Sequence, residues 1–326
     1  MISMRTRSDA ASPDISSAYQ KPHTFWQCAA AFTGDVAYSH PARTAARFTR
    51  PNVYRLRRRR LVLGKGRPAA SPDQQPVPIA SLAKVMTAYL VLKRYPLDGA
   101  QDGFTITVTT DQAQAEAEDR SENQSVVAVA VGEQLTERQL LEALLIPSGN
   151  NIAWILAGQA AGSETSFVAE MNAEARALGI DHTTYTDPSG WDHGTVSTAA
   201  DQLRVFRQAM RFPAFREIVS MPSVALPVAG TLTNFNPLLA VGFGGKTGSD
   251  SAAGGCLAFF TNVTVGGRSV TAVGVVLGQG QGSDTSQILA AAGNAAEQLV
   301  QSAVPTSGTS TVGAPGPGGA PTRAVG

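Results

Sequence analysis

The order of periodic segments constrains the fold of this chain most, because helical patterns fill its middle and β patterns come late. Residues 81–95 predict a helix, since Leu82, Val85 and Met86 belong to a broad apolar stripe at helical spacing that ends at Pro96. Further helices are predicted at residues 136–146, 151–161, 164–178, 198–211 and 286–300.

The β patterns comprise an early run at residues 104–109 and a late group. Residues 243–249 are a candidate strand, and residues 256–265 and 269–277 predict a hairpin across a Gly-Gly turn. Helical patterns in the middle of the sequence and β patterns near its end indicate a mixed α/β (α+β) fold with a partly antiparallel sheet.

Charge divides the chain into a basic front and a mildly acidic body. Residues 1–70 carry 13 Lys and Arg against 3 Asp, whereas residues 71–326 carry 13 against 22 Asp and Glu. We therefore expect a basic, irregular segment at residues 1–70, a folded domain at 71–301 and a flexible Gly/Pro/Ser/Thr tail at 302–326. Short strands at residues 29–38 and 61–63 are candidates within the basic front.

Several function classes find little support in the sequence. Cys28 and Cys256 make neither a disulfide framework nor a cysteine metal site, and no HExxH zinc motif occurs. The arginine-rich residues 55–60 have no accompanying nucleic-acid-binding motif, so no nucleic-acid partner is expected. No stretch approaches the ~20 apolar residues of a membrane helix, and the N-terminus shows no export signal.

Three short motifs carry the chemistry, and the first is Ser81-Leu82-Ala83-Lys84 at the start of a predicted helix. Side chains three apart on a helix share one face, about 5–6 Å apart at Cβ. A serine hydroxyl is a weak nucleophile that needs a neighbouring base. Lys84 can be that base if burial and a second cation, such as Lys246, lower its pKa until the amine is neutral.

The second motif, Ser148-Gly149-Asn150, follows the helix-breaking Pro147 and is expected on a loop. The hydroxyl of Ser148 can relay a proton between Lys84 and a leaving group. The amide of Asn150 can hold a substrate amide through its donor and its acceptor.

The third motif, Lys246-Thr247-Gly248, lies in a predicted edge strand. Lys246 and Thr247 can bind an anion such as a terminal carboxylate, and Gly248 lets a substrate approach the backbone. The backbone N–H groups of Ser81 and Ser249 are a natural pair for an oxyanion hole.

Each motif alone has an ordinary structural explanation. An N-capped helix explains the first, a turn explains the second, and a glycine-containing strand explains the third. Their combination is the stronger signal, because the chain has only five lysines and two of them fall in the motifs.

The three motifs in this order resemble those of the serine D-alanyl-D-alanine carboxypeptidases, the low-molecular-mass penicillin-binding proteins of the peptidase S11 type. The similarity includes flanking segments and covers about residues 76–300. The flanking segments are residues 78–88, 167–172, 178–179, 187–190 and 197–201.

The resemblance implies a five-stranded antiparallel sheet flanked by helices, with an all-helical part that holds the second motif. It implies Ser81 as acyl-enzyme nucleophile, Lys84 as base, Ser148 and Asn150 in the middle motif, and Lys246 on the substrate carboxylate. The substrate would be the D-Ala-D-Ala end of a peptidoglycan stem peptide in the cell envelope, with β-lactams as inhibitors. No metal or organic cofactor is implied.

The family carries an export signal and places one or two strands before the nucleophile, whereas the basic front of this chain is hard to match. Residues 31–38 resemble the family's first hairpin but lie far upstream. We therefore hypothesise that much of residues 1–60 is not the native leader and reflects a wrong start or a shifted frame.

Two alternative functions use the same residues. A serine β-lactamase shares the acylation chemistry but needs a base for deacylation, such as the glutamate of class A enzymes. Four glutamates lie between the second and third motifs, and none stands in a recognisable deacylation loop: Glu164, Glu170, Glu174 and Glu217. A non-catalytic penicillin or peptidoglycan binder would bind penicillin without turning over a D-Ala-D-Ala peptide.

Overall fold

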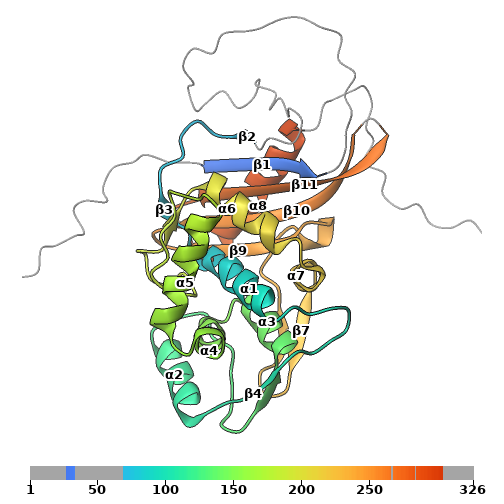
Figure 1. The fold of residues 1–326 in the computed structure, drawn as a ribbon. Helices are drawn as coiled ribbons and strands as arrows, with labels where there is room; N and C mark the ends of the chain where they lie inside the picture. The colour runs from blue at the N-terminus through green and yellow to red at the C-terminus, as the bar shows by residue number, and fades with distance from the viewer. Residues whose placement is uncertain (1–26, 34–68, 266, 283, 304–326) are drawn as a thin grey trace, which may run out of the picture.

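A five-stranded antiparallel sheet forms one layer of the molecule in the computed structural model, which describes residues 27–33, 69–265, 267–282 and 284–303 (Figure 1). The strands lie in the order β2-β1-β11-β10-β9. Their bounds are β1 Gln27–Thr33, β2 Ala69–Ala70, β9 Gly244–Asp250, β10 Gly254–Val265 and β11 Arg268–Gln279. This sheet is the one that the family resemblance implies.

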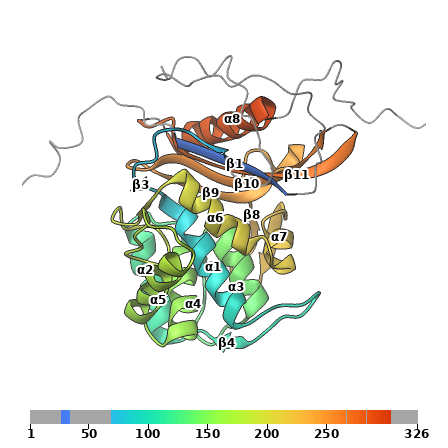
Figure 2. The ribbon, with the colours of Figure 1, turned by 45° about the horizontal axis from the view of Figure 1, so that its top comes forward.

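The helix α8 (Thr285–Ala303) covers one face of the sheet, and the helical part lies against the other (Figure 2). Between the sheet and α8, Leu257 and Phe259 of the sheet belong to one apolar cluster with Ala292 and Ala296 of the helix. The opposite face joins the larger core. The sheet is therefore covered on both faces, and its last strand, β9, lies beside the helical part.

The helical part surrounds α1, in which nine of twelve residues are buried. Its helices are α1 Ala83–Arg94, α2 Thr110–Ser121, α3 Glu137–Leu145, α4 Asn150–Ala161, α5 Glu164–Ala177, α6 Ala199–Ala209 and α7 Pro213–Ile218, with 3-10 turns η3 Ala80–Leu82 and η4 Leu239–Val241. Short strand pairs join the connections: β3 Val77–Pro78 with β6 Val196–Ser197, β4 Thr105–Thr107 with β5 Gln134–Thr136, and β7 Ser223–Leu226 with β8 Gly230–Thr233.

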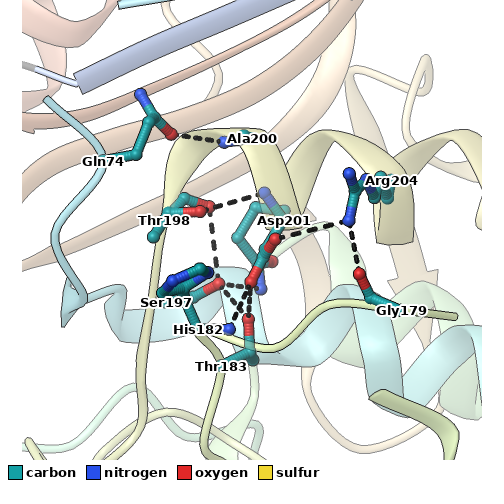
Figure 3. Close-up of polar contacts among 10 residues, drawn as sticks. Gln74, Gly179, His182, Thr183, Ser197, Thr198, Ala200, Asp201 and Arg204 are labelled. Carbon is teal, nitrogen blue, oxygen red and sulfur yellow. Dashed lines mark hydrogen bonds and ion pairs between the residues drawn. The ribbon is translucent and has the colours of Figure 1, made fainter. Parts of the chain in front are cut away.

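Threonine side chains cap two of these helices at their N-termini. The hydroxyl of Thr136 accepts the N–H of Gln139 in a complete capping box at α3. At α6, the hydroxyl of Thr198 accepts the N–H of Asp201 (Figure 3). The carboxylate of Asp201 accepts the backbone N–H of His182, and so ties α6 to the preceding loop.

Two differences from the sequence-based expectations concern the ends of the chain. Residues 1–70 are not irregular throughout, because β1 pairs with β11 over seven residues and β2 extends the sheet further. The predicted strand at 29–38 is thus correct as far as Thr33, whereas the candidate strand at 61–63 lies outside the described residues. The helix α8 runs to Ala303, so the first two residues of the expected tail are helical.

Candidate active site

The 3-10 turn η3 places Ser81 at the entrance of the buried helix α1. Ala80 adopts a left-handed backbone, with φ of 46°, and the α-helix itself begins only at Ala83. Lys84 lies in the first turn of α1, and its Nζ lies at a hydrogen-bonding distance of 2.9 Å from the Oγ of Ser81. The predicted Ser-Lys pair is therefore within direct hydrogen-bonding distance.

Lys84 is fully buried and touches three oxygens. Its Nζ lies 2.9 Å from Ser81 Oγ, 2.6 Å from Asn150 Oδ1 and 2.9 Å from the backbone oxygen of Ser189. Burial lowers the pKa of Lys84 well below its ordinary value, the nearby charge of Lys246 lowers it further, and Asp187 partly opposes both. These surroundings favour the neutral amine.

The second motif reaches the site from the start of α4. Ser148 is a non-glycine residue in the left-handed region, with φ of 67°, and Asn150 is the first residue of the helix. The amide nitrogen of Asn150 donates to Gln124 Oε1 at 2.7 Å. Because its oxygen contacts Lys84, Asn150 retains only one N–H and one lone pair for a substrate.

The third motif lies on β9, with Lys246 pointing to Ser148. The Nζ of Lys246 donates to Ser148 Oγ at 3.0 Å, and burial lowers the pKa of this lysine to about 7. Thr247 is also buried. A Cβ on Gly248 would lie 2.8 Å from the oxygen of Ile79, so glycine at this position lets β9, the strand that contains Ser249, pack against the turn η3.

The loop at residues 187–192 completes the surroundings of Lys84, and sequence reasoning gave it no role. The carboxylate of Asp187 accepts N–H groups from Ser189, Gly190 and Asp192, and so shapes the loop that presents the Ser189 oxygen to Lys84. A Cβ on Gly190, whose φ is 79°, would lie 1.9 Å from the oxygen of Ala80. The Asp-Pro-Ser-Gly sequence is a turn signal that could have drawn attention to this loop.

The structure thus brings all three motifs into one polar cluster. Lys84 joins Ser81 to Asn150, and Lys246 joins the third motif to Ser148. The cluster offers a hydroxyl nucleophile, a buried amine beside it and a second buried amine.

The comparison with protein families agrees with this geometry. A family model described as D-alanyl-D-alanine carboxypeptidase, Peptidase_S11, matches residues 69–280, well over half of the chain. The chain belongs to the peptidase S11 family. The match begins at β2, so β1 precedes the part of the chain that the peptidase S11 model describes.

Curated relatives match this chain over part of their length. The D-alanyl-D-alanine carboxypeptidase DacB2 of Mycobacterium tuberculosis is 40% identical over 136 residues, which are 39% of this chain and 46% of that protein. A D-alanyl-D-alanine endopeptidase of Pseudomonas aeruginosa is 31% identical over 203 residues, which are 57% and 60% of the two chains. The chain thus spans about half the length of these curated relatives.

A solved structure shares the fold. A mutant of the Streptomyces K15 DD-transpeptidase superposes with a TM-score of 0.62 at 26% identity, and the superposition covers 73% of this chain and 93% of that one. The expected DD-peptidase-like fold of a peptidase S11 member is therefore confirmed.

Proposed function

We propose that this protein is a serine D-alanyl-D-alanine carboxypeptidase that removes the terminal D-Ala from peptidoglycan stem peptides through a Ser81 acyl-enzyme. The observation that carries the proposal is the distance of 2.9 Å between the buried amine of Lys84 and the hydroxyl of Ser81. A general base must lie within hydrogen-bonding reach of the proton that it removes, and Lys84 meets that condition.

The contacts of Lys84 support its role as a base. A neutral amine has two N–H donors and one lone pair. The Asn150 and Ser189 oxygens can only accept, so they take the two N–H groups. The lone pair is then left for the hydroxyl proton of Ser81, which is the arrangement that nucleophilic attack requires.

In the proposed acylation, Ser81 Oγ bonds to the carbonyl carbon of the penultimate D-Ala while Lys84 takes the hydroxyl proton. The N–H groups of Ser81 and Ser249 stabilise the oxyanion. The proton then passes from Lys84 through Ser148 to the leaving nitrogen, and D-alanine departs. Water attacks the resulting ester by the same proton route in reverse, and this regenerates Ser81 and leaves the shortened peptide.

The substrate's terminal carboxylate is assigned to Lys246 and Thr247. The Nζ of Lys246 makes hydrogen bonds to Ser148 Oγ and to the Thr247 backbone oxygen and retains a third donor for a ligand. A charge-assisted bond to a carboxylate there would bind free-acid peptides in preference to esters. Asn150 is assigned the peptide amide through its remaining N–H and lone pair.

The proposed substrate lies outside the cytoplasm, and so the site of action does too. Within the described residues no helix is long and apolar enough to cross a membrane. β-lactams, which are strained amides, would acylate the same Ser81, and the proposed cellular roles are cell-wall maturation and cell shape.

One experiment tests the proposal directly. Purified protein is incubated with a D-Ala-D-Ala peptide, and released D-alanine is measured for the wild type and for Ser81→Ala. We expect release by the wild type only, and loss of labelling by a fluorescent penicillin in the variant. Labelling of the wild type without D-alanine release would favour the non-catalytic binder, and full labelling of Ser81→Ala would refute the nucleophile.

The β-lactamase alternative depends on a glutamate that can activate water. Three of the four glutamates considered make ion pairs with basic side chains, which are Glu170 with Arg94, Glu174 with Lys93, and Glu217 with Arg138. Only Glu164 has no ion pair among the described residues, and it lies within electrostatic reach of Asp187. We therefore expect the penicillin adduct to persist in intact-mass spectra. Rapid hydrolysis that Glu164→Gln abolishes would establish the alternative.

A further inference from the structure

A second candidate site lies apart from the polar cluster, in a groove between α6, α7 and β11. The groove has a volume of about 590 Å³ and is lined by Arg204, Arg207, Arg211 and Arg216, whereas none of its lining residues is Asp or Glu. It shares no residue with the three motifs. These four are among only nine arginines in the described residues of an otherwise acidic body.

The fold concentrates these arginines from two elements. Arg204, Arg207 and Arg211 follow one another at intervals of three and four along α6 and its C-terminal end, so they share one face of the helix. At 1.5 Å per residue, their Cα atoms span about 10 Å along the axis. Arg216 comes from α7, and Thr271 and Val273 of β11 also line the groove.

Most of this charge is not neutralised by the protein. Arg204 lies 3.9 Å from the carboxylate of Asp201 and donates to the Gly179 oxygen (Figure 3). Arg211 and Arg216 contact only neutral oxygens, and Arg207 has no hydrogen-bond or ion-pair partner in the part of the chain that the structure describes. Among the described residues, Asp201 is therefore the one acidic side chain that forms an ion pair with any of these four guanidinium groups.

A solvated helix face does not account for this arrangement. The helix dipole favours cations in the last turn of α6, which explains Arg207 and Arg211. It does not explain why Arg216 of another helix joins them around a hollow. The chain's own basic front does not complement the groove either, because residues 34–68 carry ten Lys and Arg and one Asp.

We propose that this groove binds a soluble ligand that carries several phosphate groups. The planar guanidinium group can donate two parallel hydrogen bonds to two oxygens of one phosphate. A chain of phosphates carries several negative charges in a row, as the arginines of α6 carry several positive ones. A volume of about 590 Å³ lies in the ordinary range for small-molecule sites. The proposal is independent of the chemistry assigned to Ser81.

The test is calorimetric titration of the full chain with tripolyphosphate, at fixed salt because anion binding is screened. We expect saturable binding at one site and a raised Tm. Arg207→Gln and Arg216→Gln should each weaken binding about tenfold or more. Arg268→Gln, an exposed arginine of β11 outside the groove, is the matched control and should bind as the wild type does.

Three results would overturn the proposal. The first is no saturable binding by the wild type, and the second is an equal loss in Arg207→Gln and Arg268→Gln. The third is equal affinity for citrate, which would show a general preference for anions rather than for phosphate. Capture by phosphatidylglycerol vesicles without tripolyphosphate binding would likewise refute a soluble ligand and assign the face to a membrane surface.

Discussion

Two buried lysines give the polar cluster its chemical properties. Water would hold both amines charged at neutral pH, but burial disfavours the charged form and their proximity adds repulsion. The amine of Lys84 contacts two oxygens that can only accept hydrogen bonds, those of Asn150 and Ser189. The amine of Lys246 contacts one hydroxyl and one backbone oxygen. These surroundings suit the two roles proposed above, a neutral base for Lys84 and a carboxylate-binding cation for Lys246.

The first prediction concerns the pH dependence that Lys246 imposes. Its pKa is lowered to about 7, so the free enzyme loses this cation as pH rises through that value. We expect kcat/KM for a free-acid D-Ala-D-Ala peptide to fall above about pH 7. The corresponding ester should not show that fall, and both substrates should lose rate at low pH, where Lys84 becomes protonated.

Lys246→Gln supplies the control for that assignment. The loss of a charge-assisted bond of ~1.5–3 kcal/mol should lower kcat/KM for the free acid by roughly 10–150-fold. The ester should be affected much less. Equal losses on both substrates would mean that Lys246 acts by tuning Lys84 instead.

The second prediction concerns Glu137, a buried carboxyl at the start of α3. Its Oε1 has no hydrogen-bond partner among the described residues, and burial raises its pKa from 4.5 to about 7. Between those values the folded state binds more protons than the unfolded state, so wild-type stability falls as pH rises through the window. Glu137→Gln should therefore stabilise the protein at pH 8 by up to about 3 kcal/mol and have little effect at pH 4.5.

Urea unfolding at both pH values measures this difference. The exposed Asp181→Asn is the control, and it should leave the pH dependence between these two pH values unchanged. A Glu137→Gln variant that is less stable than the wild type at pH 8 would show that the ionised carboxylate is satisfied in the folded protein.

At the scale of elements, three backbone segments meet around Ser81. The turn η3 lies between β9 on one side and the loop at residues 187–192 on the other, and each neighbour approaches through a glycine. Gly248 of β9 faces the Ile79 oxygen, and Gly190 of the loop faces the Ala80 oxygen. The position of Ser81 is therefore set by backbone packing as well as by its helix.

The third prediction is that Gly190→Ala slows acylation by at least tenfold. A Cβ at this position would lie 1.9 Å from the Ala80 oxygen, so the loop or the turn must move and the Ser189 contact to Lys84 changes. The positive φ of 79° adds strain of about 1 kcal/mol or more. The measurement is the rate of penicillin labelling, together with Tm.

Gly162→Ala separates strain from displacement. Gly162 ends α4 with φ of 77°, and a Cβ there would have no neighbour within 4 Å. It should lower Tm by a similar strain and leave labelling unchanged. If Gly190→Ala and Gly162→Ala label equally fast, then the contact with η3 does not position Ser81.

The elements that sequence reasoning predicted are those with strong local patterns. The apolar stripe of α1 and the glycine turn between β10 and β11 identified these elements, because burial and turn geometry are local there. The helix α2 was missed, since its sequence is polar and only Glu116 is buried. The short helix α7 and the hairpin of β7 and β8 lack a long periodic run.

The motifs converge as predicted, but their detailed contacts could not be read from spacing. Asn150 touches Lys84 because Ser148 turns the chain with a left-handed backbone, and serine gives no sequence signal for that conformation. The Ser189 oxygen reaches Lys84 through a loop 105 residues away in sequence. Backbone groups carry no residue signature, so such partners appear only in the folded chain.

At the scale of the whole molecule, β1 links the two ends of the sequence. It pairs with β11 from Gln27 opposite Leu277 to Thr33 opposite Thr271. Its Ala29 and Ala31 belong to the large core, and Ala30 belongs to the core under α8. β1 is therefore an integral strand of the sheet, and the hypothesis that much of residues 1–60 is not the native leader stays a prediction.

The side chain of Gln27 further ties β1 to the helical part. It is buried, its amide donates to the Gln75 oxygen, and its oxygen accepts the N–H of Ala199 at 3.2 Å. This N–H is among those at the start of α6 that have no partner within the helix. β1 thus completes both the sheet and a helix terminus, although the family match begins after it.

The fourth prediction is that a chain beginning at residue 69 aggregates or unfolds at a lower temperature than the full chain. Without β1, the strand β11 has unpaired backbone N–H and C=O groups along the edge that includes Val275 and Leu277. Such an exposed edge can pair with a strand of another molecule. A chain lacking only residues 1–26 keeps every contact of β1 and should label with penicillin as the full chain does.

In the full chain, Ala30→Glu should reproduce the loss of stability, because it places an unpaired charge between the sheet and α8 at a cost of several kcal/mol. Solubility, Tm and penicillin labelling are measured for all three. If the chain from residue 69 folds and labels like the full chain, then β1 is an accessory strand and the fold is complete within the matched region.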